Sequence, residues 1–154
     1  MELYFVMKKE TIRKSIGIGA SKEKVWEVLF DEKYLPIWYA EFSLGACAQG
    51  TWRVGSKILF TDISGGGLVG KVVVNRPCRV FSVEYLGLVV TGEEDYESDE
   101  ARALRGGREI YRLQEQEGSV LLSVETDMPE ESYNSMALAW EKALLKIRYL
   151  AEAA

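Results

Sequence analysis

The end of the chain carries one long apolar stripe, and this feature restricts the fold more than any other. From Pro129 onward, apolar residues recur at steps of three or four, the spacing of one helix face: Tyr133, Met136, Trp140, Leu144, Ile147 and Ala151. Pro129 suits the first turn of such a helix, and the acidic Glu130 and Glu131 complement its positively polarised end. The pattern predicts an amphipathic helix along about 25 residues, which must pack its stripe against an apolar surface.

That surface is predicted to be a β-sheet. Segment 8–19 alternates between isoleucine and polar residues, as a half-buried strand does. Ser21 then offers a cap for a short helix that ends near Asp31, and Pro36 lies in a short turn over 34–38. Turns rich in Gly and Pro separate further runs, which are predicted to be antiparallel strands: 51–54, 57–63, 68–76, 79–88, 108–116 and 119–128.

An antiparallel sheet with helices on one face is an α+β architecture. A strongly twisted sheet can wrap around a single long helix, and a cavity remains where the two do not quite meet. The chain has no internal repeat or low-complexity linker, so a single domain over residues 1–154 is expected. The acidic stretch 89–108 is expected to be a loop with one or two helical turns, which could gate a cavity or contact a partner.

Composition excludes several kinds of site. The chain has no histidine, so it cannot build a Ser-His-Asp triad, an imidazole metal site or a histidine general base. Its 24 acidic and 19 basic residues give a formal charge of -5, which argues against nucleic-acid binding. Cys47 and Cys78 do not form a CxxC pair, so no structural zinc site is expected. Both cysteines are predicted to be reduced thiols buried in the core.

The sequence also predicts the cellular compartment of the protein. No apolar run approaches the roughly 18 residues of a membrane span. The opening MELYFVMKKETI is too short and too soon charged for a secretory signal. We therefore expect a cytoplasmic protein with no membrane span, no metal, no cofactor and no nucleic-acid partner.

Four segments of the sequence resemble one known family. They are ASKEKVWEVLFDEKYLPIW, GTWRVGSKILFTD, GKVVVNRPCRVFSVEYLGL and AWEKALLKIRYL. Together they resemble the START-like superfamily (SRPBCC), also called the polyketide-cyclase and Bet v allergen group, and within it the branch of activator of heat-shock-protein-90 ATPase homologues. The resemblance extends from about Thr11 to Leu150. It implies a helix-grip fold, in which a curved antiparallel sheet holds the C-terminal helix above an apolar ligand cavity, and it implies no catalytic residue.

The alternation of each strand predicts which side chains face the helix, because successive residues point to opposite faces of a sheet. The inward set is rich in aromatic rings. Each ring alone is expected to fill the core, whereas the set together favours gaps suited to a flat apolar ligand. The residues expected to line a cavity are Trp38, Tyr39, Phe42, Trp52, Phe60, Asp62, Phe81, Val83, Tyr85, Glu109, Tyr111, Leu122, Tyr133, Met136, Trp140 and Leu144.

Two carboxylates belong to this inward set. Asp62 and Glu109 either find hydrogen-bond partners in the interior or have a raised pKa there, and such groups are candidate ligand anchors or acid and base catalysts. The alternative is that both lie at strand ends, where solvent reaches them. Tyrosine hydroxyls on the same faces could bond either a ligand or the backbone.

Three functions follow from these observations. The leading hypothesis is binding of a small hydrophobic or amphipathic ligand, such as a lipid, between the sheet and the C-terminal helix. The second is a cyclase, hydrolase or dehydratase that uses Asp62 or Glu109 as acid or base and a tyrosine as hydrogen-bond donor. The third, which the resemblance implies, is an interaction protein that binds a chaperone and alters its ATPase cycle. A homodimer is a further open alternative.

Overall fold

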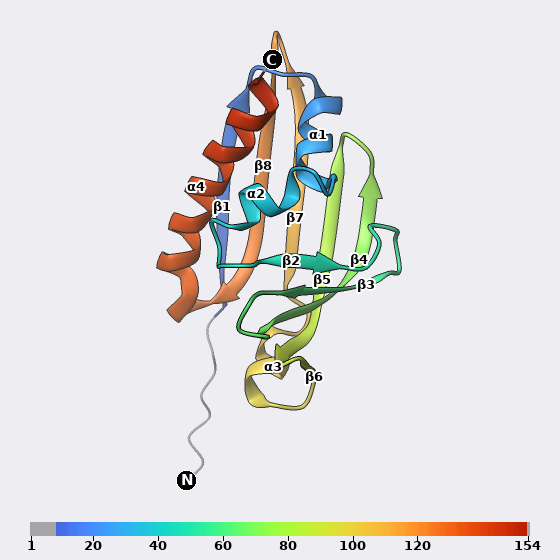
Figure 1. Ribbon diagram of the computed structural model, residues 1–154, viewed down its shortest axis with the longest axis vertical. Helices are drawn as coiled ribbons and strands as arrows, with labels where there is room; N and C mark the ends of the chain where they lie inside the picture. Colours follow the sequence, from blue (N-terminus) through green and yellow to red (C-terminus); the bar gives the residue numbers. More distant parts are fainter. Residues whose placement is uncertain (1–8, 154) are drawn as a thin grey trace.

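The computed structural model describes residues 9–153, which build a strongly twisted antiparallel sheet (Figure 1). The strands are β1 (Lys9–Ile18), β2 (Cys47–Gln49), β3 (Lys57–Thr61), β4 (Gly67–Arg76), β5 (Val80–Val90), β6 (Glu93–Asp95), β7 (Arg108–Gln116) and β8 (Ser119–Pro129). They form one eight-stranded sheet in the order β1-β8-β7-β5-β4-β3-β2, and β6 pairs with β5. In Figure 1, β2 and β3 run across the direction of β1, β8 and β7.

The helices are α1 (Lys22–Phe30), α2 (Leu35–Tyr39), α3 (Asp99–Leu104) and α4 (Tyr133–Glu152), and a 3₁₀ turn, η1 (Glu130–Ser132), leads into α4. α4 packs along β1 and also contacts α1 and α2 (Figure 1). Its buried face contains Trp140, Leu144, Ile147 and Ala151, four members of the predicted stripe. The α+β class and the helix-grip arrangement predicted from the sequence are therefore confirmed.

The first strand and the first helix form where their sequence patterns place them. On β1, Ile12 and Ile18 are buried, whereas Arg13 and Ser15 are exposed. The hydroxyl oxygen of Ser21 accepts a hydrogen bond from the amide of Lys24 at 3.1 Å, so it satisfies one of the free amides at the start of α1. Together β1 and α1 supply the apolar surfaces that hold α4 in place.

Two irregularities bend the sheet at the pairing of β4 with β5. The pairing of β4 with β5 shifts register between Val69 and Gly70 and again between Val72 and Val74, as β-bulges do. At Gly70 a Cβ atom would lie 2.4 Å from Cγ1 of Val83, so only glycine permits this close approach of the strands. The sheet curves here, and the curvature makes room on its concave face.

The structure corrects several predicted boundaries. Residues 51–54 form a loop rather than a strand, because Gly50 and Gly55 have φ angles of 135° and 93° and interrupt the pairing. The edge strand is instead β2. Pro129 ends β8 and does not enter the C-terminal helix, which begins at Tyr133 after the 3₁₀ turn. The short turn around Pro36 is one turn of helix, α2, and the acidic stretch contains β6 as well as the expected helical turns.

Candidate functional site

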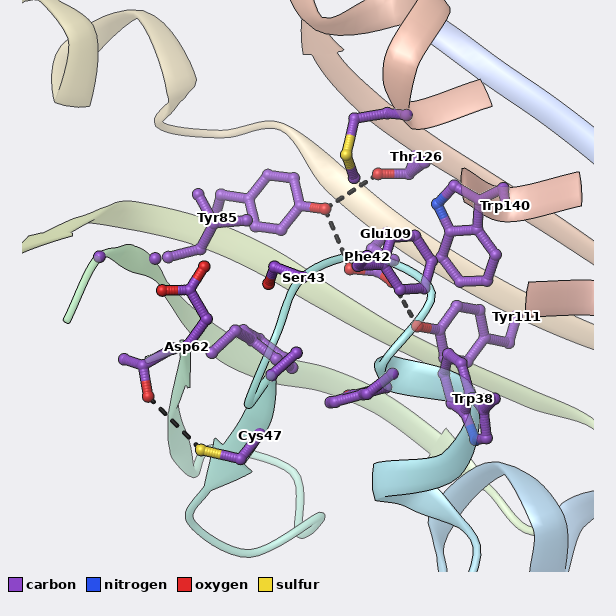
Figure 2. A pocket seen from close by; sticks show the side chains of 18 residues that line it. Trp38, Phe42, Ser43, Cys47, Asp62, Tyr85, Glu109, Tyr111, Thr126 and Trp140 are labelled. Atoms are coloured by element: carbon purple, nitrogen blue, oxygen red, sulfur yellow. Dashed lines mark hydrogen bonds between the residues drawn. The ribbon is translucent and has the colours of Figure 1, made fainter. Parts of the chain in front are cut away.

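A cavity of about 340 Å³ lies between the concave face of the sheet and the two helices α2 and α4 (Figure 2). Residues from α2 and the loop after it, from β2 to β5, from β7 and β8, and from α4 surround it. They are Trp38, Tyr39, Phe42, Ser43, Ala46, Cys47, Phe60, Thr61, Asp62, Gly66, Gly67, Leu68, Tyr85, Glu109, Tyr111, Thr126, Met136 and Trp140. The site is therefore assembled from distant parts of the chain.

Aromatic rings form one wall of the cavity. The indole of Trp140 meets the ring of Phe42 with centroids 4.8 Å apart, that of Tyr111 at 5.7 Å and that of Trp38 at 6.0 Å. The Nε1–H of Trp38 donates a hydrogen bond to the carbonyl oxygen of Val28 at 3.0 Å, which fixes the orientation of this buried indole. Rings held in this way offer a preformed surface for a flat apolar molecule.

A polar cluster lies beside this wall. Strand register brings its members together, because Glu109 of β7 pairs with Thr126 of β8, and Tyr111 follows Glu109 on the same face. Glu109 accepts a hydrogen bond from the hydroxyl of Tyr85 at 3.0 Å and another from the hydroxyl of Tyr111 (Figure 2). The Oγ1 atom of Thr126 lies 2.9 Å from the hydroxyl oxygen of Tyr85. Because Tyr85 gives its single hydroxyl hydrogen to Glu109, Thr126 is the donor in that pair.

Burial changes the acidity of every member of this cluster that titrates. Loss of solvent raises the pKa of Glu109 above its ordinary value of 4.5, and the two phenol donors offset this in part. The pKa values of Tyr85 and Tyr111 are raised well above 10.0, chiefly by burial and then by the nearby charge of Glu109. Both tyrosines therefore remain protonated donors at neutral pH, and Glu109 holds a proton more tightly than an ordinary glutamate does.

The second predicted carboxylate lies in different surroundings. Asp62 follows the end of β3 at the rim of the cavity, where its Oδ1 accepts hydrogen bonds from the hydroxyl and the amide of Ser64. These bonds lower the pKa of Asp62 below 3.8. Both carboxylates are half-buried and line the cavity, Asp62 at its rim and Glu109 within the polar cluster.

Ten of the sixteen side chains predicted to line a cavity do so. The other six lie elsewhere in the structure. Val83, Leu122 and Leu144 are closed inside the core, and Tyr133 packs at the start of α4. Phe81 and Trp52 pack around Phe30, which contacts them at centroid distances of 4.7 Å and 5.3 Å, and Phe81 reaches the cavity rings only through its stacking on Tyr111. Strand parity identified the face of the sheet on which Phe81 lies, but Phe30 of α1 covers that part of it.

Eight lining residues were missed. Thr126 shares the parity of Leu122 and Val124, so continuing the alternation along the strand would have found it. The others belong to the loop after α2 and to β2, the β3–β4 turn and their flanks, where no periodic pattern signals a face: Ser43, Ala46, Cys47, Thr61, Gly66, Gly67 and Leu68.

The prediction that both cysteines are core residues is wrong. Cys47 is exposed at the cavity, with its Sγ atom 3.5 Å from Oγ1 of Thr61, and Cys78 is half-buried in a turn with a φ of 64°. Within the described part of the chain, no three His, Cys, Asp or Glu side chains lie together as metal ligands would. No helix among residues 9–153 is long and apolar enough to cross a membrane.

Comparison with solved structures identifies the fold. The Aha1 dimer from Colwellia psychrerythraea superposes with a TM-score of 0.71 at 20% sequence identity, covering 93% of this chain and 96% of that chain. CalU16 from Micromonospora echinospora gives 0.64 at 19% identity, covering 92% of this chain and 65% of that one. DynU16, a protein in the dynemicin biosynthetic locus, gives 0.67 at 13% identity, covering 93% and 47%.

These similarities confirm the START-like fold that the sequence resemblance implied, with Aha1-like proteins among its structural neighbours. At such identities they define the fold, and the residues of the cavity define what the site can do. Neither the protein-family models nor the curated protein sequences contain a match to this chain.

Proposed function

We propose that this protein binds a small hydrophobic or amphipathic ligand in the cavity between the sheet and α4. The observation that carries the proposal is the cavity itself, with an aromatic wall and, beside it, the carboxyl group of Glu109. Small-molecule sites in proteins typically combine an apolar lining with a few convergent polar groups. A volume of about 340 Å³ lies at the small end of the usual range for such sites, which favours a compact ligand of two or three rings.

A titration with Prodan, a neutral naphthalene dye whose emission shifts in apolar surroundings, tests this proposal. The matched pair of variants is Ala46→Phe, which places a ring in the cavity lining, and Ala153→Phe, which adds the same ring at the exposed end of α4. We expect saturable binding that Ala46→Phe weakens about tenfold or more and Ala153→Phe leaves unchanged. A flat titration of the wild-type protein, or equal binding by both variants, would refute the proposal.

A second candidate function is supported by one specific observation. Burial raises the pKa of Glu109 beside the cavity, and the two phenol donors stabilise its ionised form, so this carboxyl group is placed to take up a proton as a general base. DynU16, one of the similar structures, is a protein in a biosynthetic locus. The enzyme candidate predicts that the wild-type protein hydrolyses aryl esters, such as 4-nitrophenyl acetate, faster than the Glu109→Gln variant at equal Prodan affinity. Equal rates for both proteins would count against this chemistry.

Partner proteins form a separate proposal. Similarity to a dimeric Aha1 structure favours a homodimer, and the outer face of α4 exposes three large apolar side chains: Leu138, Leu145 and Tyr149. Light scattering should give a dimer mass that Leu145→Glu reduces to that of a monomer. A monomer at about 100 µM would refute the homodimer, because a dimer with a dissociation constant in the micromolar range is largely formed at that concentration. The chaperone alternative rests on the sequence resemblance, and a pull-down that retains no chaperone would remove it.

A further inference from the structure

The charges around the cavity have one sign. Among its 18 lining residues, Asp62 and Glu109 carry carboxyl groups, and none is lysine or arginine. The chain has no histidine either. A ligand that carries a carboxylate, a phosphate or a sulfate would therefore meet two acidic groups and no basic side chain in the lining. This arrangement selects against anionic amphiphiles such as fatty acids.

Glu109 also retains free capacity to accept hydrogen bonds. A carboxylate offers about four acceptor positions, and the hydroxyls of Tyr85 and Tyr111 occupy one on each oxygen. Among residues 9–153, Glu109 takes part in none of the seven ion pairs. Its side chain is only half-buried, and the part that remains accessible borders the cavity. A carboxylate placed in this way lacks a positively charged partner, which buried charges ordinarily have.

The rings around Glu109 favour the same kind of partner. Phe42, Tyr111 and Trp140 line the same cavity as Glu109, and the hydroxyl of Tyr111 bonds its carboxyl group (Figure 2). The faces of aromatic rings carry partial negative charge and attract ammonium groups, most strongly for tryptophan. A positive charge near Glu109 would thus be stabilised by the carboxylate and by the rings together, while the apolar remainder of the molecule fills the cavity.

We infer that the natural ligand is an amphipathic amine, whose ammonium group donates hydrogen bonds to Glu109 and whose apolar body packs on Trp38, Phe42 and Trp140. The inference rests on the proposed ligand-binding function and narrows it to one chemical class. Asp62 contributes at the rim, where its charge draws a cation toward the cavity. Because Asp62 lies at the rim and its Oδ1 already accepts two hydrogen bonds from Ser64, its influence on affinity is smaller than that of Glu109.

Three probes that share one ring system and differ in charge test whether the site prefers a cation. They are 2-naphthylmethylamine, which is positively charged at neutral pH, the neutral 2-naphthylmethanol and the negatively charged 2-naphthoate. Their affinities are measured by calorimetry and by displacement of Prodan. We expect the amine to bind about tenfold tighter than the alcohol and the naphthoate to bind most weakly. An alcohol that binds as tightly as the amine, or a naphthoate that binds tightest, would overturn the inference and leave the proposed function intact.

Two variants test whether Glu109 causes the preference for the amine over the alcohol. Glu109→Gln removes the charge and keeps the shape, and Glu115→Gln makes the same change on the same strand at an exposed position outside the cavity. We expect Glu109→Gln to reduce the preference for the amine over the alcohol to about twofold or less, and Glu115→Gln to preserve it. An unchanged preference in Glu109→Gln would refute the role of this carboxylate. Binding of none of the probes, Prodan included, would instead refute the ligand-binding function itself.

Discussion

The substitution Trp140→Ala tests whether the indole of Trp140 borders a cavity or is enclosed in a solid core. Removing a tryptophan that protein atoms enclose on every side costs about 3–5 kcal/mol of stability. Trp140 is 2% exposed to solvent and contacts three rings, yet part of its indole borders the cavity. On that side the indole has no protein contacts to lose. We therefore expect a smaller destabilisation, about 2–3 kcal/mol, together with a loss of Prodan affinity of about tenfold or more.

Urea unfolding followed by far-ultraviolet circular dichroism measures the stability, because this signal does not depend on the tryptophan that is removed. The matched control is Ile147→Ala, which lies on the same helix, is 0% exposed and is absent from the cavity lining. It should cost about 2–5 kcal/mol and leave Prodan binding unchanged. A Trp140→Ala variant that loses 4 kcal/mol or more and binds Prodan normally would show that the indole is enclosed and that our assignment of the cavity is wrong.

Two further predictions concern titration and helix capping. Because burial raises the pKa of Glu109 above 4.5, the folded protein holds this proton more tightly than the unfolded chain does. The stability that this provides is complete below pH 4.5 and is lost as the pH rises through the folded-state pKa, so Glu109→Gln should gain stability relative to wild type over that range. Urea unfolding of both proteins from about pH 4 to about pH 8 tests this, and parallel stability profiles would contradict it. Replacing the cap of α1, Ser21→Ala, should cost about 1 kcal/mol by the same assay, and no loss would mean that its bond to Lys24 is not stabilising.

Much of the fold could be predicted from periodicity alone. Strand β7 has the predicted bounds, because apolar Tyr111 and Leu113 alternate with polar Arg112 and Gln114 and the turn at Glu117-Gly118 marks where the strand must reverse. The C-terminal stripe predicted the buried face of α4 for a similar reason, since a helix with one apolar face has one way to bury it. In both elements a local pattern determines a local structure.

The site was less predictable than the fold. The alternation of residues along a strand shows which face of the sheet a side chain is on, but it does not show which part of that face borders the cavity. Phe81 and Tyr111 are directly paired across β5 and β7 and point to the same side, yet Tyr111 lines the cavity and Phe81 does not. The difference depends on where α1 and α2 lie above the sheet, and no strand pattern carries that information. Asp62 shows a second limit, because the turn that begins after Thr61 carries it out to the rim.

Gly70 gives the cavity its capacity in an indirect way. A methyl group at this position would lie 2.4 Å from Cγ1 of Val83 and 3.2 Å from the ring of Phe60, which lines the cavity. Relief of that clash would displace the Phe60 ring, and a shift of this ring would change the shape of the cavity. Under the proposed function, the size of ligand that fits the cavity is thus governed partly by Gly70, a residue outside the cavity lining.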